Sequence, residues 1–188
     1  MLWLSVVEWA ARLILLFLIV LSVWSVMIMI EKRRYFRSVQ FPVNELRARF
    51  RSKNFSFMPG EFFGDFFNEM KSLKSSEQIE RAFDSYATEK RKELEKGLPV
   101  LGTLGSTTPF VGLLGTILGI IVSFGELSRG AGSTNSVMFS LAEALILTAV
   151  GLIVAIPAVV AYNFYGKKVK SILSEAQSLK DLYLAYRE

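Results

Sequence analysis

The chain contains no cysteine and no histidine among its 188 residues. Without cysteine it forms no disulfide and has no thiolate for catalysis or metal binding. Without histidine it lacks the commonest general base, a frequent metal ligand and the side chain that ordinarily titrates near neutral pH. A Ser–His–Asp triad is therefore excluded, and any group that exchanges protons has to be a carboxylate.

Nucleotide-binding and metal-binding motifs are also missing. Gly112, Gly115 and Gly119 lack the Lys-Ser/Thr pair of a phosphate loop, and they lie in an apolar run. No carboxylates occur at the spacing of metal ligands. We therefore expect no enzymatic activity, no catalytic residues, no metal site and no cofactor.

Apolar residues make up 52% of the chain and are concentrated in three blocks. The net charge is +5, from 22 basic and 17 acidic residues, and the basic clusters flank the apolar blocks. This arrangement suits the negatively charged cytoplasmic leaflet of a membrane better than it suits a nucleic acid. We expect membrane lipids as partners and no nucleic acid.

Three apolar segments are long enough to span a bilayer. They are expected at about Val6–Ile30, Gly105–Glu126 and Val137–Tyr165. The first is too long for a signal peptide and has no cleavage site, so we expect it to be retained. Pro99 and Pro109 predict that the second helix is kinked or starts late.

Charge indicates the orientation of these spans. Of the 22 Lys and Arg residues, Arg12 and Arg129 alone fall on the expected outer side, so the N-terminus is expected outside and the C-terminus in the cytoplasm. We divide the chain into an N-terminal segment with the first span (1–30), a cytoplasmic helical region (31–97), the second span (98–127), an outer loop (128–136), the third span (137–165) and a cytoplasmic C-terminal helix (166–188, amphipathic from Ser171).

The cytoplasmic region carries its own helix signals. Phe41-Pro42 is expected to end the first helix, and Pro59-Gly60 to open the next. The aromatic stripe that follows is typical of packing against another helix; it comprises Phe62, Phe63, Phe66, Phe67 and Met70. Ser75 and Gln78 then have the spacing of a capping box at the start of a further helix.

Small and hydroxylated residues share one face of each of the last two spans at 100° per residue. These faces comprise Thr108, Gly112, Thr116, Gly119 and Ser123 in the second span, and Ser140, Ala144, Thr148, Gly151, Ala155 and Ala158 in the third. Small residues let helix backbones approach closely in lipid. Each face is therefore suited to a close helix neighbour or to a narrow polar passage.

Glu143 is the one carboxylate inside the third span. A charge at mid-helix costs roughly 3 kcal/mol on insertion scales, so such a residue indicates function. Two roles remain open for Glu143, because it can exchange a proton or orient neighbouring helices. The hydroxyls of Thr116 and Thr148 both donate and accept hydrogen bonds, and they can hold water or a partner carboxylate in an apolar pore.

Two long motifs resemble signatures of the ExbB/TolQ family, which is related to the MotA stators. The segment from Leu98 to Thr116 (LPVLGTLGSTTPFVGLLGT) is similar to the second-span signature of that family. The segments 142–145 (AEAL), 148–152 (TAVGL) and 155–159 (AIPAV) are similar to its third-span signature. The match covers about Glu93–Lys168 with both motifs in the family's order, whereas the first span matches only in kind.

The resemblance implies an all-α, three-span protein whose long helices extend into the cytoplasm and which forms a homopentamer around a central pore. It implies a proton-conducting subunit of a motor in the bacterial inner membrane. The pore then surrounds a smaller partner of the ExbD/TolR type, a dimer with one span and a membrane Asp per chain. A TonB/TolA-like protein is a further implied partner, and the motor drives outer-membrane transport, envelope maintenance or gliding.

By the same resemblance, Thr116 and Thr148 match the pore-lining threonines and Glu143 matches the intramembrane glutamate. The cytoplasmic region and C-terminal tail are shorter than in the family, which leaves the client process open. Two other functions are weighed against the motor. The small-residue faces also suit a non-conducting membrane scaffold, while a substrate carrier is disfavoured because no internal repeat is visible.

Overall fold

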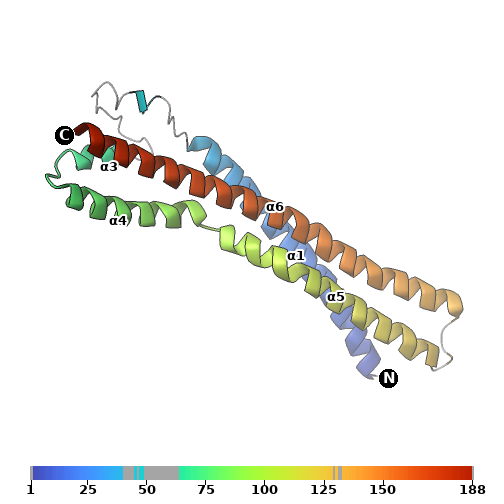
Figure 1. Cartoon of the computed structure of the whole chain (residues 1–188). Helices are drawn as coiled ribbons and strands as arrows, with labels where there is room; N and C mark the ends of the chain where they lie inside the picture. The colour runs from blue at the N-terminus through green and yellow to red at the C-terminus, as the bar shows by residue number, and fades with distance from the viewer. Residues whose placement is uncertain are drawn as a thin grey trace. The chain divides into compact units, whose positions relative to one another are not determined.

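The computed structural model describes residues 2–39, 45, 47–48, 64–128, 130 and 133–187, and their regular structure is entirely α-helical. The helices are α1 (Leu2–Ser38), α3 (Gly64–Met70), α4 (Ser76–Glu95), α5 (Leu98–Ser128) and α6 (Thr134–Arg187), shown in Figure 1. Among these described helices, α1, α5 and α6 are long and apolar enough to cross a membrane. The expected breaks at Phe41-Pro42 and Pro59-Gly60 lie outside the described residues.

The chain divides into two compact units. An apolar unit comprises Met1–Ile30 and Gly97–Asn163, and a polar unit comprises Glu31–Lys96 and Phe164–Glu188. Each unit combines segments that are far apart in the sequence, because α1 and α6 each contribute to both.

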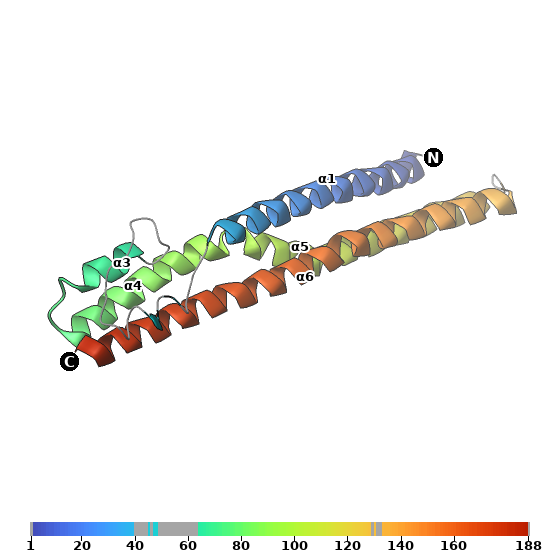
Figure 2. The same ribbon diagram turned by 90° about the horizontal axis from the view of Figure 1, so that it is seen from above.

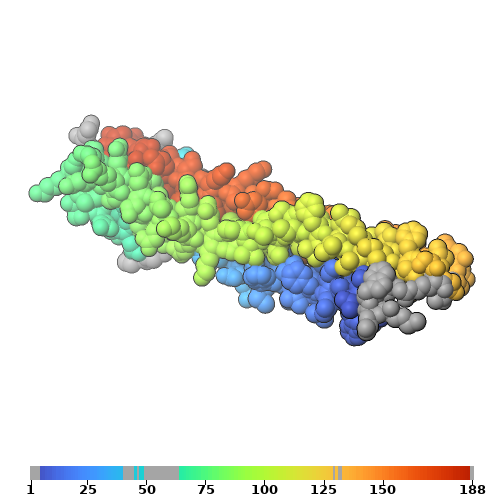
Figure 3. Space-filling view, turned by 90° about the horizontal axis from the view of Figure 1, so that it is seen from below, coloured from blue at the N-terminus to red at the C-terminus, as the bar shows by residue number. Residues whose placement is uncertain are grey.

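In the apolar unit, α5 and the first part of α6 lie side by side as an antiparallel hairpin (Figures 1 and 2). Gly130, in the connecting turn, has φ +64°, a backbone conformation that glycine adopts without strain. The apolar portion of α1 lies along α5 in the space-filling view (Figure 3), and a Cβ built on Gly115 would lie 3.2 Å from the Ile14 side chain.

Two helices differ from the sequence expectations. The second helix was expected to be kinked or to start late; α5 begins at Leu98, which excludes the late start, and Pro109 lies inside it. Pro99 falls in the first turn, where the N–H groups have no intrahelical partner. α6 continues without a break to Arg187, so the C-terminal segment from Ser171 is not a separate helix. The single glycine at position 166 does not break α6, because a mid-helix glycine costs only about 1 kcal/mol.

The polar unit has an aromatic core. The Phe66 ring on α3 stacks on Tyr86 of α4 at 4.9 Å between centroids and meets Phe83 edge-on at 5.5 Å. Phe67 and Met70 are buried beside Phe66, so the predicted helix packing of the aromatic stripe is confirmed for its described members. Ser75 caps α4 as predicted, and its N–H donates to the Gln78 side chain at 3.4 Å.

Two side chains from the end of α1 hold the C-terminal end of α4 within this unit. Lys32, which is buried, donates from Nζ to the Leu94 carbonyl at 3.2 Å. The Tyr35 hydroxyl donates to the Glu93 carboxylate at 2.9 Å. The last turn of α4 therefore has partners for one of its unpaired carbonyls and for one of its charges.

Candidate functional site

The small-residue faces of α5 and α6 pack directly on each other. A Cβ built on Gly112 would lie 2.7 Å from the Leu147 carbonyl oxygen, and one built on Gly151 would lie 2.7 Å from the Thr108 carbonyl oxygen. One built on Gly119 would lie 2.5 Å from the Ala144 Cβ. No side chain fits at these three positions without moving a helix, so glycine sets the interhelical distance.

Two hydroxyls lie at the centre of this α5–α6 interface. The hydroxyls of Thr116 and Thr148 contact each other, and Thr116 Oγ1 lies 2.9 Å from the Ala144 carbonyl oxygen. Each hydroxyl carries one proton. Because the Ala144 carbonyl can only accept, one arrangement that these contacts allow has Thr148 donating to Thr116 and Thr116 donating to Ala144; the Gly112 carbonyl oxygen, 3.4 Å from Thr148 Oγ1, is the other acceptor within reach.

The exposure of the two threonines differs. Thr116 is 6% exposed, whereas Thr148 is half-buried. With its proton directed toward Thr116, Thr148 keeps lone pairs for a donor that approaches from outside the interface. The pair can therefore accept a hydrogen bond from water or from a protonated carboxyl.

The other residues of the two predicted faces fall into three groups. The buried ones are Thr108, Gly112, Ser123, Ala144, Gly151, Ala155 and Ala158; the half-buried ones are Gly119 and Ser140; and Glu143, which lies beside the third-span face, is exposed. The Thr108 and Ser123 hydroxyls donate to carbonyls one turn earlier, at 2.7 and 2.9 Å. For the buried small residues, close helix packing accounts for their position.

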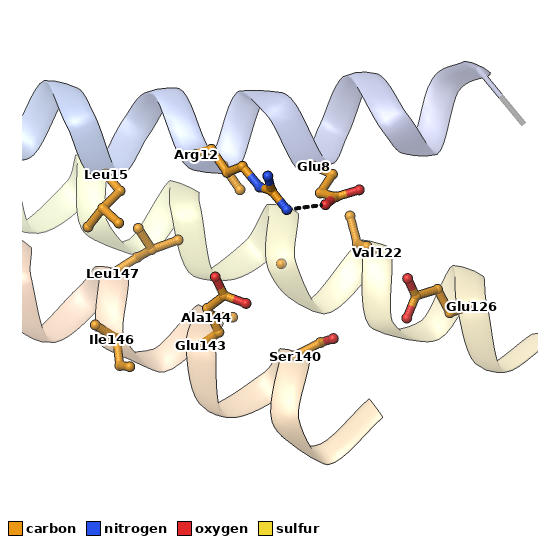
Figure 4. A pocket seen from close by; sticks show the side chains of 12 residues that line it. Glu8, Arg12, Leu15, Val122, Glu126, Ser140, Glu143, Ala144, Ile146 and Leu147 are labelled. Carbon is orange, nitrogen blue, oxygen red and sulfur yellow. Dashed lines mark hydrogen bonds and ion pairs between the residues drawn. The ribbon is translucent and has the colours of Figure 1, made fainter. Parts of the chain in front are cut away.

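Glu143 points away from the interface into a cavity of about 290 Å³ (Figure 4). All three apolar helices line this cavity, with Glu8 and Arg12 from α1, Glu126 from α5 and Ser140 from α6 beside Glu143. Arg12 donates to Glu8 at 2.7 Å, one helical turn away. In the part of the chain that the structure describes, neither Glu126 nor Glu143 makes an ion pair.

Sequence reasoning did not select Glu8, Arg12 or Glu126 as site residues. Glu8 and Arg12 could have been found from the sequence, because opposite charges four residues apart lie on one face of a helix and can pair there. Glu126 had no comparable signal, because it lies near the end of its span. Among the described residues, no group of three or more acidic side chains is arranged to hold a metal ion.

Comparisons with known proteins all indicate the same protein family. A family model described as the MotA/TolQ/ExbB proton channel family matches residues 56–178. The chain is 41% identical over 120 residues to the biopolymer transport protein ExbB of Xanthomonas campestris, covering 60% of this chain and 47% of the relative. It is 40% identical over 114 residues to the ExbB of Aquifex aeolicus, covering 59% of this chain and 68% of the relative.

The Tol-Pal system protein TolQ of Pseudomonas aeruginosa is 40% identical over 110 residues, covering 58% of this chain and 48% of the relative. The chain thus spans about half the length of its Xanthomonas and Pseudomonas relatives. The region matched by the family model contains the α5–α6 interface and Glu143, but it does not include Glu8 or Arg12.

Proposed function

Because the chain belongs to the MotA/TolQ/ExbB proton channel family, we propose that it is a proton-conducting subunit of an inner-membrane motor. Five copies surround the membrane helices of a smaller ExbD/TolR-type partner, a dimer whose single spans each carry an Asp. Proton flow through this assembly is coupled to work in the periplasm or at the outer membrane. The N-terminus is periplasmic and the C-terminus cytoplasmic.

The single observation that carries this proposal is the hydrogen-bonded pair of Thr116 and Thr148 between α5 and α6. Thr148 has an accessible acceptor oxygen, and Thr116 is anchored to the Ala144 carbonyl. A partner carboxyl that arrives protonated can donate to Thr148, whereas a charged carboxylate can only accept a hydrogen bond from it. The two protonation states of a partner Asp therefore make different hydrogen bonds with the pair, which suits a proton-driven motor.

The surface of the apolar unit supports assembly into a ring. Large apolar side chains are exposed along all three of its helices, including Phe17, Trp24, Phe110, Phe139 and Ile153. Lipid covers some of these, and neighbouring copies cover others. One chain has too few helices to enclose a channel, and a symmetric ring of copies supplies the rest.

The test is proton flux in vesicles that contain the full chain and its single-span partner. Replacing both hydroxyls, Thr116→Val with Thr148→Val, is expected to lower the flux about tenfold, the effect of losing one hydrogen bond worth about 1.4 kcal/mol. The matched control is Thr107→Val on the exposed side of α5, whose hydroxyl bonds only to the Thr103 carbonyl of its own helix. Unchanged flux in the double variant would overturn the proposal.

A non-conducting scaffold is the second candidate, and the close glycine contacts at Gly112 and Gly151 favour it. A scaffold predicts that Thr148→Val and Glu143→Gln alter the size of the assembly while proton flux stays absent in every variant. Measuring assembly mass and flux on the same samples separates the two functions. A transported solute in an uptake assay would instead indicate a carrier.

A further inference from the structure

The two hydroxyls between α5 and α6 have more acceptors within reach than protons to donate. Thr116 Oγ1 lies 2.9 Å from the Ala144 carbonyl oxygen and 3.3 Å from the Gly112 carbonyl oxygen. Thr148 Oγ1 lies 3.4 Å from the same Gly112 oxygen, and the two hydroxyls contact each other. One proton has to lie between the two hydroxyl oxygens, because otherwise their lone pairs face each other. A single proton is then left for all the other acceptors.

The source of the shared proton decides whether the Ala144 carbonyl is bonded by α5. If Thr148 supplies it, Thr116 is free to donate to Ala144; we call this the inward arrangement. If Thr116 supplies it, Ala144 receives no hydrogen bond from α5, and Thr148 donates elsewhere; we call this the outward arrangement. The two differ only in the directions in which the two O–H bonds point.

The distances favour the inward arrangement while Thr148 has no partner outside the interface. Its bond from Thr116 to Ala144, at 2.9 Å, falls in the usual O–H···O range of about 2.5–3.0 Å. The outward arrangement has only the 3.4 Å contact from Thr148 to Gly112 in its place. Thr148 is half-buried whereas Thr116 is 6% exposed, so a group from outside reaches the pair through Thr148.

A donor and an acceptor that arrive at Thr148 have opposite effects. A neutral carboxyl donates to Thr148, which keeps its own proton for Thr116, and the inward arrangement remains. A carboxylate accepts the Thr148 proton, so Thr116 has to supply the shared proton and no longer donates to Ala144. A hydrogen bond to a charged acceptor is roughly twice as strong as one to a neutral carbonyl, so the carboxylate prevails.

Ala144 lies where the two helices are in close contact. It is 2% exposed, and a Cβ built on Gly119 of α5 would lie 2.5 Å from the Ala144 Cβ. The hydrogen bond from Thr116 joins a side chain of α5 to the backbone of α6 beside this contact. Losing that bond weakens the attachment of α6 to α5 at this point.

We propose that Ala144 is a positioning residue, whose carbonyl Thr116 holds while a donor sits at Thr148 and releases when a carboxylate accepts from Thr148. This inference rests on the proposed proton-conducting function, and it adds the route by which the protonation state of the partner carboxyl reaches the backbone of α6. The chain neither gains nor loses a proton in the change, because both hydroxyl protons stay on their own oxygens.

The sequence allows the Ala144 carbonyl to be observed alone. Ala144-Leu145 is the one Ala–Leu pair in the chain. Alanine labelled with ¹³C at its carbonyl and leucine labelled with ¹⁵N therefore give a single coupled signal, which solid-state NMR of the full chain in lipid bilayers measures. A hydrogen bond moves a carbonyl ¹³C resonance downfield, so its loss moves the Ala144 resonance upfield.

The first measurement uses the chain alone. Thr116→Val is expected to move the Ala144 resonance upfield, and Thr116→Ser, which keeps a hydroxyl, is expected to leave it in place. Thr148→Val is also expected to leave it in place, because Thr116 then donates only to the backbone. Thr107→Val, on the exposed side of α5, is the matched control. An unchanged resonance in Thr116→Val would overturn the proposal.

The second measurement adds the single-span partner and compares acidic with alkaline pH. Alkaline pH is expected to move the Ala144 resonance toward its position in Thr116→Val. The move is expected to be absent from the Thr148→Val complex, and from a complex whose partner has Leu in place of its membrane Asp. A resonance that stays in place, or that moves equally in the Thr148→Val complex, contradicts the proposal.

The charged side chains of this chain need their own control. Among the described residues, Glu8, Arg12, Glu126 and Glu143 line the cavity that Ala144 also borders. The chain without its partner, measured at the same two pH values, reports what these groups contribute. The resonance is expected to stay in place there, and a move as large as that in the complex also overturns the proposal.

Proton flux, measured on the same complexes, separates this proposal from the proton-conducting function. If the flux depends on both threonines while the Ala144 resonance stays in place, conduction stands and the role of Ala144 is wrong. If the resonance moves as expected while no variant changes the flux, the role of Ala144 stands and conduction through the threonine pair is wrong.

Discussion

Gly112 of α5 and Gly151 of α6 face each other where the two helix backbones are in close contact. A Cβ built on Gly151 would lie 3.1 Å from the Gly112 Cα, and one built on Gly112 would lie 3.3 Å from the Gly151 Cα. Each would also lie 2.7 Å from a carbonyl oxygen of the opposing helix. Backbone atoms cannot move out of the way as flexible side chains can, so the contact requires glycine on both sides.

Gly112→Ala and Gly151→Ala are each expected to lower the free energy of unfolding by about 1–3 kcal/mol, the usual cost of overpacking. The added methyl group forces the helices apart and weakens the contacts along the interface. Thermal unfolding of the full chain in detergent, followed by circular dichroism, measures the loss.

Gly166→Ala is the matched control for these two substitutions. Gly166 also lies inside α6, but a Cβ there would have nothing within 4 Å. Alanine favours a helix over glycine by about 1 kcal/mol, so this variant is expected to be as stable as the unmodified chain or more so. If all three variants destabilise equally, the close approach at Gly112 and Gly151 is not what fixes the helix pair.

The hydroxyls of Thr116 and Thr148 are expected to be energetically coupled. Because each hydroxyl is a partner of the other, the double variant Thr116→Val with Thr148→Val loses less stability than the sum of the single losses. The expected coupling is about 1 kcal/mol, the net value of one hydrogen bond. A double-mutant cycle on thermal unfolding measures it, and a cycle of Thr107→Val with Thr148→Val is expected to be additive.

The main features of the apolar unit could be predicted from sequence, since they depend on local periodicity. Charge-free runs indicate long helices, and a 3.6-residue period placed Thr108, Gly112 and Thr116 on one face. The same arithmetic placed Ala144, Thr148 and Gly151 together. The Ser75 cap was predictable for a similar reason, because its partner Gln78 is three residues away.

Two features could not be predicted, because they depend on distant parts of the chain. The cavity joins Arg12 to Glu143, which are far apart in sequence, and no local pattern indicates that α1 lies beside this part of α6. The sequence pattern also did not predict that α6 continues as one helix through Gly166. The basic cluster at Lys167-Lys168 marks a membrane boundary, but a boundary in charge is not a break in backbone hydrogen bonding.

The Phe66 ring is expected to be essential to the polar unit. It is 2% exposed and contacts the rings of Phe83 and Tyr86. Phe66→Ala removes most of these contacts, and large aromatic truncations in cores cost about 3–5 kcal/mol. Hydrogen exchange of the α4 amides should rise strongly in Phe66→Ala and less in Phe66→Leu. Equal exchange in both variants would argue against a packed aromatic core.

The Glu93 carboxylate is expected to make the end of α4 sensitive to acid. The hydrogen bond from Lys90 at 2.8 Å, and after it the one from Tyr35 at 2.9 Å, hold the pKa of Glu93 below its ordinary value. A carboxyl whose pKa is lower in the folded chain stabilises the fold above its unfolded pKa, about 4.3. That stability is lost as the pH falls through the lower, folded pKa.

Amide hydrogen exchange in the last two turns of α4, compared between about pH 6 and pH 3 after correction for intrinsic rates, measures this loss. Glu93→Gln is expected to remove the pH-dependent part, because glutamine does not titrate. Glu89→Gln, which changes an exposed glutamate one turn earlier on α4, is the matched control and should retain it. If Glu93→Gln shows the same acid-induced opening as the unmodified chain, the carboxylate does not link α4 to Tyr35 in the way described.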